Sequence, residues 1–239
     1  MELHADLSHP ALVHAGRLPW VPSPAAGVER RMLFRLGGEQ AIATSIVRYA
    51  AGSSFPSHVH PGGEEFLVLS GVFEDEHGRY PAGSYVRNPP GSAHAPGSSE
   101  GCIIFVRLWQ FRSDDRQRIV DVPAPSRGVC SRFMPRPLFG GLDEHVAIIS
   151  RKPHAAIEFA AHGGLELLVL EGQLSARGDG LEPWSWLRLP PGVPLSGAAG
   201  SAGCVAWVKT TAPWPRTAAP PQHSASRGAL SDHDGETSV

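Results

Sequence analysis

The sequence is poor in cysteine, in charge of either sign and in long apolar runs. Three cysteines are spread over 239 residues without a Cys-x-x-Cys pair, so neither a zinc finger nor a disulfide framework is expected. The net charge of −2 gives no indication of a nucleic-acid partner or of an anionic membrane surface as partner. No apolar run is long enough to span a bilayer, and the N-terminus lacks the features of a secretory signal. We therefore expect a cytoplasmic protein with free thiols and no membrane partner.

Glycine and proline, in contrast, are abundant. The 27 glycines and 23 prolines separate short runs rich in Val, Ile, Phe and Trp, such as "AIATSIVRY", "CIIFVRLWQF" and "CVAWVKT". Runs of this length between turn residues are typical of strands rather than helices. The composition predicts an all-β fold made of many short strands.

The chain contains an internal repeat. The run "GGEEFLVLSG" at 62–71 resembles "GGLELLVLEG" at 163–172, and "VRNPPGSAH" at 86–94 resembles "LRLPPGVPL" at 187–195. Both pairs are separated by the same 101 positions, and a "GC" pair recurs one position out of step. A register kept over three blocks indicates a duplication. Two all-β units of this size favour paired small barrels or jelly rolls.

The composition also suggests where the units begin and end. We expect an N-terminal arm at 1–30, a first barrel at 31–112, a polar, proline-rich linker at 113–143, a second barrel at 144–212 and a disordered tail at 213–239.

One stretch of the first unit, "HVHPGGEEF" at 58–66, concentrates metal-binding side chains. His58 and His60 are two residues apart, so on a strand they face the same side. A Pro-Gly-Gly turn leads to Glu64, and the turn "PPGSA" can return His94 to the same place. Three imidazoles and a carboxylate suit Zn, Fe, Ni, Mn or Cu. The alternative is a solvated loop, as a His-x-His pair in a glycine-rich stretch often is.

The repeat separates the two glutamates of this stretch. Glu64 corresponds to Leu165, whereas Glu65 corresponds to Glu166 and stays acidic. The three histidines correspond to Phe159, Ala161 and Leu195. A carboxylate lost together with three imidazoles is the better candidate ligand, so we expect Glu64 to bind metal and Glu65 to be structural. The second unit is predicted to be a degenerate barrel without metal, which gives one ion per chain.

Other polar residues flank these motifs. Arg48, Tyr49, Tyr85 and Arg87 stand on neighbouring strands, where burial or surface placement is favoured over orientation of a ligand. His162 is expected at the surface. "FEDEHGRY" at 73–80 is interpreted as a solvated hairpin tip.

The two metal-binding stretches resemble the two cupin motifs. Residues 52–71 fit G(x)5HxH(x)3,4E(x)6G, and 83–94 fit G(x)5PxG(x)2H(x)3N without the final asparagine. More specifically, most of 30–112 is similar to the cupin-like domain of ChrR-type anti-sigma factors. This resemblance implies two tandem cupin-type (RmlC-like) jelly-roll barrels. It also implies a zinc-type metal site formed by His58, His60, Glu64 and His94.

Two functions follow from the resemblance. The first is a small-molecule or oxidative-stress sensor that holds one Zn, Fe, Mn or Ni ion. In such a sensor, Cys102 is a further candidate as a redox-sensing thiol. A sigma factor partner is not expected, because the arm is too short for the zinc-binding helical domain that grips it. The second is a metal-dependent dioxygenase acting on a small ketone, diketone or acid in the first barrel. A homodimer is expected by analogy with the fold.

Overall fold

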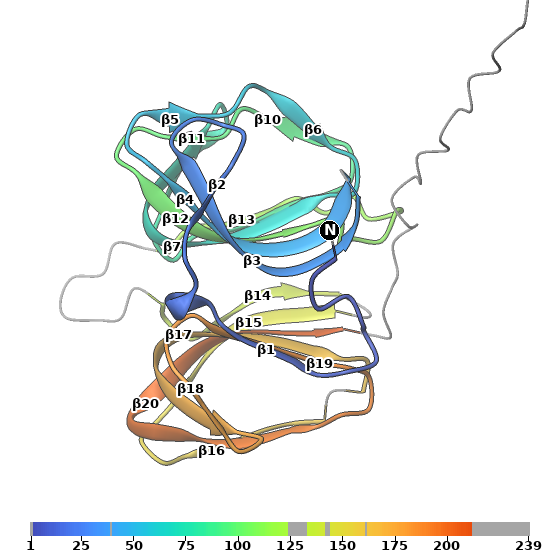
Figure 1. The fold of residues 1–239 in the computed structure, drawn as a ribbon, viewed down its shortest axis with the longest axis vertical. Helices are drawn as coiled ribbons and strands as arrows, with labels where there is room; N and C mark the ends of the chain where they lie inside the picture. The colour runs from blue at the N-terminus through green and yellow to red at the C-terminus, as the bar shows by residue number, and fades with distance from the viewer. Residues whose placement is uncertain (1, 39, 124–132, 142–143, 161, 212–239) are drawn as a thin grey trace, which may run out of the picture.

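Two antiparallel β-barrels are stacked on one another (Figure 1). The computed structural model describes residues 2–38, 40–123, 133–141, 144–160 and 162–211. The tail predicted for 213–239 lies outside the described residues. No helix in the described part of the chain is long and apolar enough to cross a membrane. The predicted all-β architecture of two tandem barrels is confirmed.

Barrel 1, the upper barrel of Figure 1, contains the metal-binding motifs. Its main sheet has the order β13-β9-β7-β12-β4-β3-β2, and β6 and β10 form a separate two-stranded sheet. The strands are β2 (Val21–Pro22), β3 (Val28–Gly37), β4 (Ala41–Tyr49), β5 (Ser53–Ser54), β6 (His58–His60), β7 (Glu64–Asp75), β8 (Gly78–Pro81), β9 (Tyr85–Asn88), β10 (Ser92–His94), β11 (Gly97–Ser98), β12 (Cys102–Leu108) and β13 (Ile119–Asp121).

Barrel 2 repeats this arrangement with the order β1-β19-β17-β20-β15-β14, to which β16 and β18 add. Its strands are β1 (Ala11–His14), β14 (Arg136–Gly140), β15 (Glu144–Arg151), β16 (Ala156–Phe159), β17 (Leu165–Ala176), β18 (Asp179–Leu181), β19 (Ser185–Leu189) and β20 (Leu195–Thr211). Its interior is filled by apolar side chains of β16, β17, β19 and β20.

The duplication is visible in the long strands β7 and β17. Both have 12 residues, and each bends at a glycine, Gly71 or Gly172, with φ of 71° or 72°. A Cβ atom at either position would collide with a backbone carbonyl oxygen, that of Gly101 or Gly203. Two features therefore require glycine at each position: the left-handed backbone conformation and the close approach of the neighbouring backbone.

The expected arm and linker contribute strands to the barrels. β1 pairs with β19 of barrel 2, a 3₁₀ turn (Ala15–Arg17) follows, and β2 then pairs with β3 of barrel 1. Within the expected linker, β13 pairs with β9 and β14 pairs with β15. The boundaries expected at residues 30, 113 and 143 therefore do not coincide with the ends of the barrels. Strands this short show too little alternation to be recognised in the sequence.

Strand alternation divides β7 between two environments. Phe66 and Val68 face the interior of barrel 1, whereas Leu67 and Leu69 join an apolar layer between the barrels. β17 contributes to this layer with the equivalent alternation. Phe105 and Trp207 meet there with ring centroids 5.0 Å apart. The two barrels therefore share one core layer, which couples their stability.

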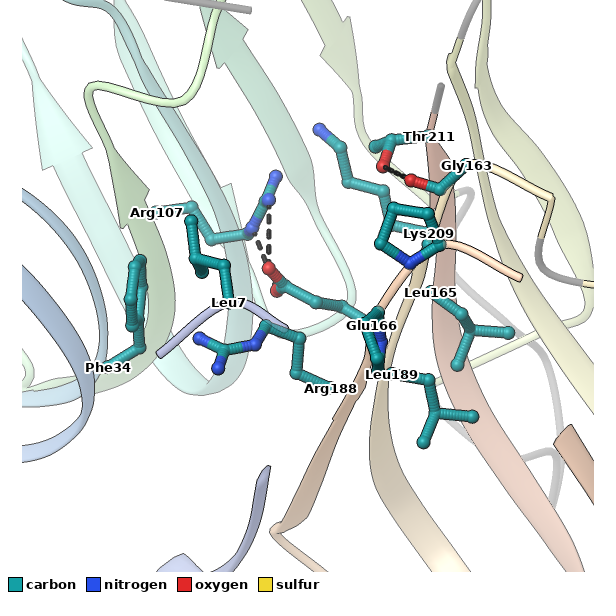
Figure 2. Close-up of a pocket in the computed structure, with 13 residues that line it drawn as sticks. Leu7, Phe34, Arg107, Gly163, Leu165, Glu166, Arg188, Leu189, Lys209 and Thr211 are labelled. Atoms are coloured by element: carbon teal, nitrogen blue, oxygen red, sulfur yellow. Dashed lines mark hydrogen bonds and ion pairs between the residues drawn. The ribbon is translucent and has the colours of Figure 1, made fainter. Parts of the chain in front are cut away.

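A cluster of buried charges lies within this layer (Figure 2). Glu65 accepts hydrogen bonds from Lys209 Nζ at 2.7 Å, from the Tyr85 hydroxyl at 2.7 Å and from Arg107. Arg107 reaches across to Glu166 of barrel 2, with Nε 3.0 Å from Oε2. Glu65 and Glu166 are equivalent in the repeat, and Arg107 and Lys209 have the spacing of its "GC" pair. The retained glutamates therefore join the barrels.

The charge cluster predicts a specific loss of stability in acid. Burial alone would raise the pKa of Glu65, but Lys209 and Arg107 outweigh it and hold the pKa well below its ordinary value. The ionised carboxylate therefore stabilises the fold above the unfolded-state pKa of about 4.3, and this contribution is lost as the pH falls through the folded-state pKa. We expect the free energy of unfolding to fall more steeply in wild type than in Glu65→Gln below about pH 5.

Urea unfolding at a series of pH values measures this difference. Glu100→Gln is the control, because the Glu100 side chain is 61% exposed and pairs only with Arg79 at the surface. This variant should follow the wild-type slope. Equal slopes for wild type and Glu65→Gln would contradict the prediction.

Candidate metal site

The three candidate histidines are brought together by one pair of strands. β6 and β10 are antiparallel, with His58 directly opposite His94 and His60 opposite Ser92. Because His58 and His60 are two residues apart, all three side chains lie on the same face of this small sheet. Their ligand nitrogens all lie within 4.8 Å of one another.

The histidine nitrogens point at a common centre. His60 Nε2 and His94 Nε2 are 3.0 Å apart, and these side chains are only 11% and 3% exposed. His58 is the most exposed of the three. Two ligands bound to one metal at about 2.0–2.1 Å are roughly 2.8–3.4 Å apart for ligand–metal–ligand angles between a right angle and the tetrahedral angle. The spacing of His60 and His94 fits this range.

Hydrogen bonds fix the orientation of two of the rings. His58 Nδ1 donates to the carbonyl oxygen of Pro56 at 2.9 Å, and His94 Nδ1 donates to Asp75 Oδ2 at 3.2 Å. In this tautomer each Nε2 keeps its lone pair free. Rings that bind metals usually donate the other N–H to a carbonyl or carboxylate in this way.

Glu64, the fourth candidate ligand, lies beside the three-histidine cluster. Its Oε2 lies 3.3 Å from His94 Nε2 and 3.7 Å from His60 Nε2. The buried side chain of Asn88, directly opposite Glu64 on β9, donates to the same oxygen at 3.5 Å. Glu65 faces the other barrel, as the strand alternation predicts. The three imidazole nitrogens form the cluster that could hold a divalent transition metal, and Glu64 is close enough to two of them to be a candidate fourth ligand.

The surroundings affect the imidazoles in different ways. Burial lowers the pKa of His60, which keeps this ring in the neutral form that binds metals. Burial would also lower the pKa of His94, but the hydrogen bond to Asp75 and the charge of Glu64 outweigh it and raise the pKa. A metal ion would therefore displace a proton at His94 when the pH is low.

Asp75 is a site residue that the sequence analysis missed. It lies in "FEDEHGRY", which was interpreted as a solvated hairpin tip, yet its side chain is only 1% exposed. Burial would raise its pKa, but hydrogen bonds from His94 and from the backbone N–H of His77 outweigh it and lower the pKa. Asp75 is therefore an ionised carboxylate behind a candidate ligand. No spacing rule links it to the cupin motifs, because the contact depends on how β7 bends over β10.

Replacing Asp75 with asparagine should weaken metal binding about 10–100-fold, the cost usually seen when the hydrogen-bond partner of a ligand is lost. The amide can keep the bond from the His77 backbone to Oδ1 but cannot accept the proton of His94 Nδ1 through its nitrogen. Competition with a chelator measures the change. Tyr80→Phe is the matched control, because it removes the hydroxyl bond to Asp75 Oδ1 at 3.1 Å and leaves both Asp75 oxygens available to His94 and the His77 backbone. Equal affinities in the two variants would contradict a role for Asp75.

A cavity of about 330 Å³ opens onto His58, His60 and Glu64. Its other walls are mostly apolar and come from β3, β4 and β12 and from the loops beside them. They comprise Ser23, Pro24, Val28, Arg30, Val47, Tyr49, Phe55, Pro96, Ile104, Val106 and Leu108. This volume is at the lower end of the range of small-molecule sites. A metal held by the four side chains would face this space.

The remaining residues highlighted by the sequence have separate places. Tyr49 lines the cavity, whereas Arg48 faces outward and pairs with Glu29 at 2.5 Å. Tyr85 and Arg87 belong to the charge cluster between the barrels. His162 is exposed, as expected.

The two cysteines that the structure describes, Cys102 and Cys204, do not belong to the site. Cys102 and Cys204 are buried, and burial raises the pKa of each thiol to about 11. Cys102 therefore stays a protonated thiol near neutral pH, whereas the reactive form of a cysteine is the thiolate.

Barrel 2 keeps the frame of the site without its donors. Phe159 pairs with Leu195 between β16 and β20, as His58 pairs with His94 between β6 and β10. Leu165, at the position of Glu64, is 2% exposed within the apolar interior. Among the described residues, the cluster of three side chains that could hold a metal ion lies in barrel 1.

Comparisons with known proteins agree with this architecture. Residues 8–112 match the family model of the ChrR cupin-like domain. No curated protein sequence matches the chain. The bacterial pirin YhhW from Escherichia coli, solved with nickel(II), is similar with a TM-score of 0.63 and 14% identity over 85% of this chain and 100% of its own. A candidate dioxygenase from Nostoc punctiforme has a TM-score of 0.60 and 14% identity over 93% and 87% of the two chains. Identities this low show a shared fold.

Proposed function

We propose that barrel 1 holds one divalent metal ion and binds a small organic molecule beside it, in a chain whose residues 8–112 match the family model of the ChrR cupin-like domain. The ligands of the ion would be His58, His60, Glu64 and His94. The observation that supports this proposal most directly is the cavity, because it reaches three of these side chains. A purely structural metal would instead be enclosed by protein on every side.

The activity that this geometry favours is that of a metal-dependent dioxygenase, or a related enzyme, acting on a small ketone, diketone or acid. An iron or manganese ion bound here would supply open coordination positions and Lewis acidity. The chain itself would orient Glu64 through Asn88 and exclude water with the apolar walls. Burial, and next the charge of Glu64, raise the pKa of Tyr49, so its hydroxyl can donate a hydrogen bond to a bound molecule.

Two similar structures support a small-molecule centre of this kind. The pirin YhhW was solved with nickel(II), and the protein from Nostoc punctiforme is described as a candidate dioxygenase. Both contain the same fold at low identity, so the metal and the reaction remain proposals for this chain. Zinc, iron, manganese and nickel are the candidate ions.

A sensing role is the second candidate, favoured by the match to the ChrR cupin-like domain. Such a sensor would respond through a ligand in the cavity, because Cys102 is a buried thiol. A sigma factor partner is not part of this proposal. The homodimer and the cytoplasmic location stay predictions.

Metal content and oxygen consumption test these functions. Protein purified without added metal should contain up to one divalent ion per chain. After anaerobic reconstitution with Fe(II), a panel of ketones, diketones and 2-oxo acids should include a compound that starts oxygen uptake, with the zinc-loaded protein as the inactive control. Tightly held zinc without uptake under any metal would favour sensing over catalysis.

A further inference from the structure

Arg30 places a positive charge in the wall of the cavity. It lies on β3 two residues from Val28, so both side chains face the interior of barrel 1 and line the same space. Its neighbour across the strands is Val47, another cavity residue. The sheet order β7-β12-β4-β3 separates Arg30 from Glu64 by two strands, so the two residues stand on different walls.

The guanidinium of Arg30 has no hydrogen-bond or ion-pair partner among the described residues. The adjacent arginines differ in this respect. Arg48 pairs with Glu29, and Arg31 lies over the ring of Trp20 with its Cζ 4.2 Å from the centroid. A guanidinium that faces a largely apolar cavity is most favourable when an anion pairs with it, and its planar fork matches a carboxylate.

The rest of the cavity limits the size and character of that anion. The cavity wall beside Arg30 is apolar, with Val28, Val47 and Ile104 on β3, β4 and β12 and Phe55 at a loop. The charge that interacts with Arg30 is a second positive one, that of Arg35. The volume of about 330 Å³ suits a metabolite-sized molecule. The occupant that fits these walls has a charged head and a short apolar body.

We propose that barrel 1 selects a small carboxylic acid whose carboxylate pairs with Arg30 while its other end faces His58, His60 and Glu64. This inference rests on the proposed function for the metal centre and specifies its substrate or ligand class. It makes Arg30 a specificity-determining residue outside the metal-binding set. Neutral ketones and diketones of the same size are then the poorer ligands.

Binding to the zinc-loaded full chain tests the proposal without turnover. The probes are 4-methyl-2-oxopentanoate and its methyl ester, which share one body and differ in charge. Isothermal titration calorimetry should show the acid binding at least roughly 10-fold more tightly than the ester, as expected for a charge-assisted pair. Arg30→Gln should remove this difference by weakening the acid alone, and Arg30→Lys should restore part of it. Arg48→Gln, on the outward face of β4, should bind as wild type does.

Several results would overturn the proposal. They are equal binding of acid and ester by the wild type, no binding of the acid, or an unchanged preference in Arg30→Gln. If inorganic phosphate bound as tightly as the acid, the site would be an unselective anion site rather than one that selects carboxylates. Failure of the metal centre would appear separately, as absent zinc in wild type and in Arg30→Gln alike.

Discussion

Replacing His60 with alanine is expected to lower the affinity for a divalent metal by more than about 100-fold, since the loss of an outer partner of a ligand alone costs about 10–100-fold. His60 Nε2 lies within the cluster, 3.0 Å from His94 Nε2 and 3.7 Å from Glu64 Oε2. Elemental analysis of protein dialysed against a weak chelator gives the occupancy. Competition with a coloured chelator gives the dissociation constant.

Two exposed histidines, His77 and His162, provide the matched controls. Each is replaced by alanine, and each should retain wild-type metal content because neither faces the cluster. The unfolding temperature of metal-free His60→Ala should stay close to that of the metal-free wild type, which separates lost ligation from lost folding. Full metal occupancy in His60→Ala would show that the ion binds elsewhere.

The adjacent substitutions Glu64→Gln and Glu65→Gln are expected to have opposite effects. Glu65→Gln removes a charge from a buried network and leaves Lys209 and Arg107 short of a partner, which should cost about 3–5 kcal/mol of unfolding free energy. In a chain of this size that corresponds to a fall in Tm of roughly 6–20 °C. Glu64→Gln should leave the metal-free protein near wild-type stability and instead lose metal affinity.

Thermal unfolding of the metal-free proteins and chelator competition together measure both effects. Arg79→Ala is the stability control, because Arg79 forms ion pairs only at the surface, where its side chain is 62% exposed. Its cost should stay below about 1 kcal/mol. If Glu65→Gln lost metal affinity and Glu64→Gln lost stability, the assignment of the two carboxylates would be reversed.

The sequence predicted the parts of this protein that depend on local spacing. The i and i+2 rule placed His58 and His60 on one face, and the comparison of repeats separated Glu64 from Glu65. Both are properties of a single strand and its turn. The all-β class followed in the same way from short apolar runs between glycines and prolines.

Contacts between distant strands could not be predicted from such spacing. Asp75 reaches His94 because β7 curves over β10, and Asn88 meets Glu64 through the register of β9 on β7. That Arg30 has no hydrogen-bond or ion-pair partner among the described residues becomes clear only when the positions of the neighbouring carboxylates are known. Likewise, the short strand β1 has too few residues to show alternation, so its pairing was not expected.

The pairing of β1 with β19 also constrains the order of events during synthesis. Ala11–His14 is synthesised well before its partner Ser185–Leu189, because barrel 1 and strands β14 to β18 lie between them in the sequence. At about 5–20 residues per second, the ribosome needs roughly 10–35 s to cover that distance. Barrel 1 can complete its sheet in that interval, while β1 remains unpaired because β19 has not yet been synthesised. β1 can therefore pair with β19 only after barrel 1 and strands β14 to β18 have been synthesised.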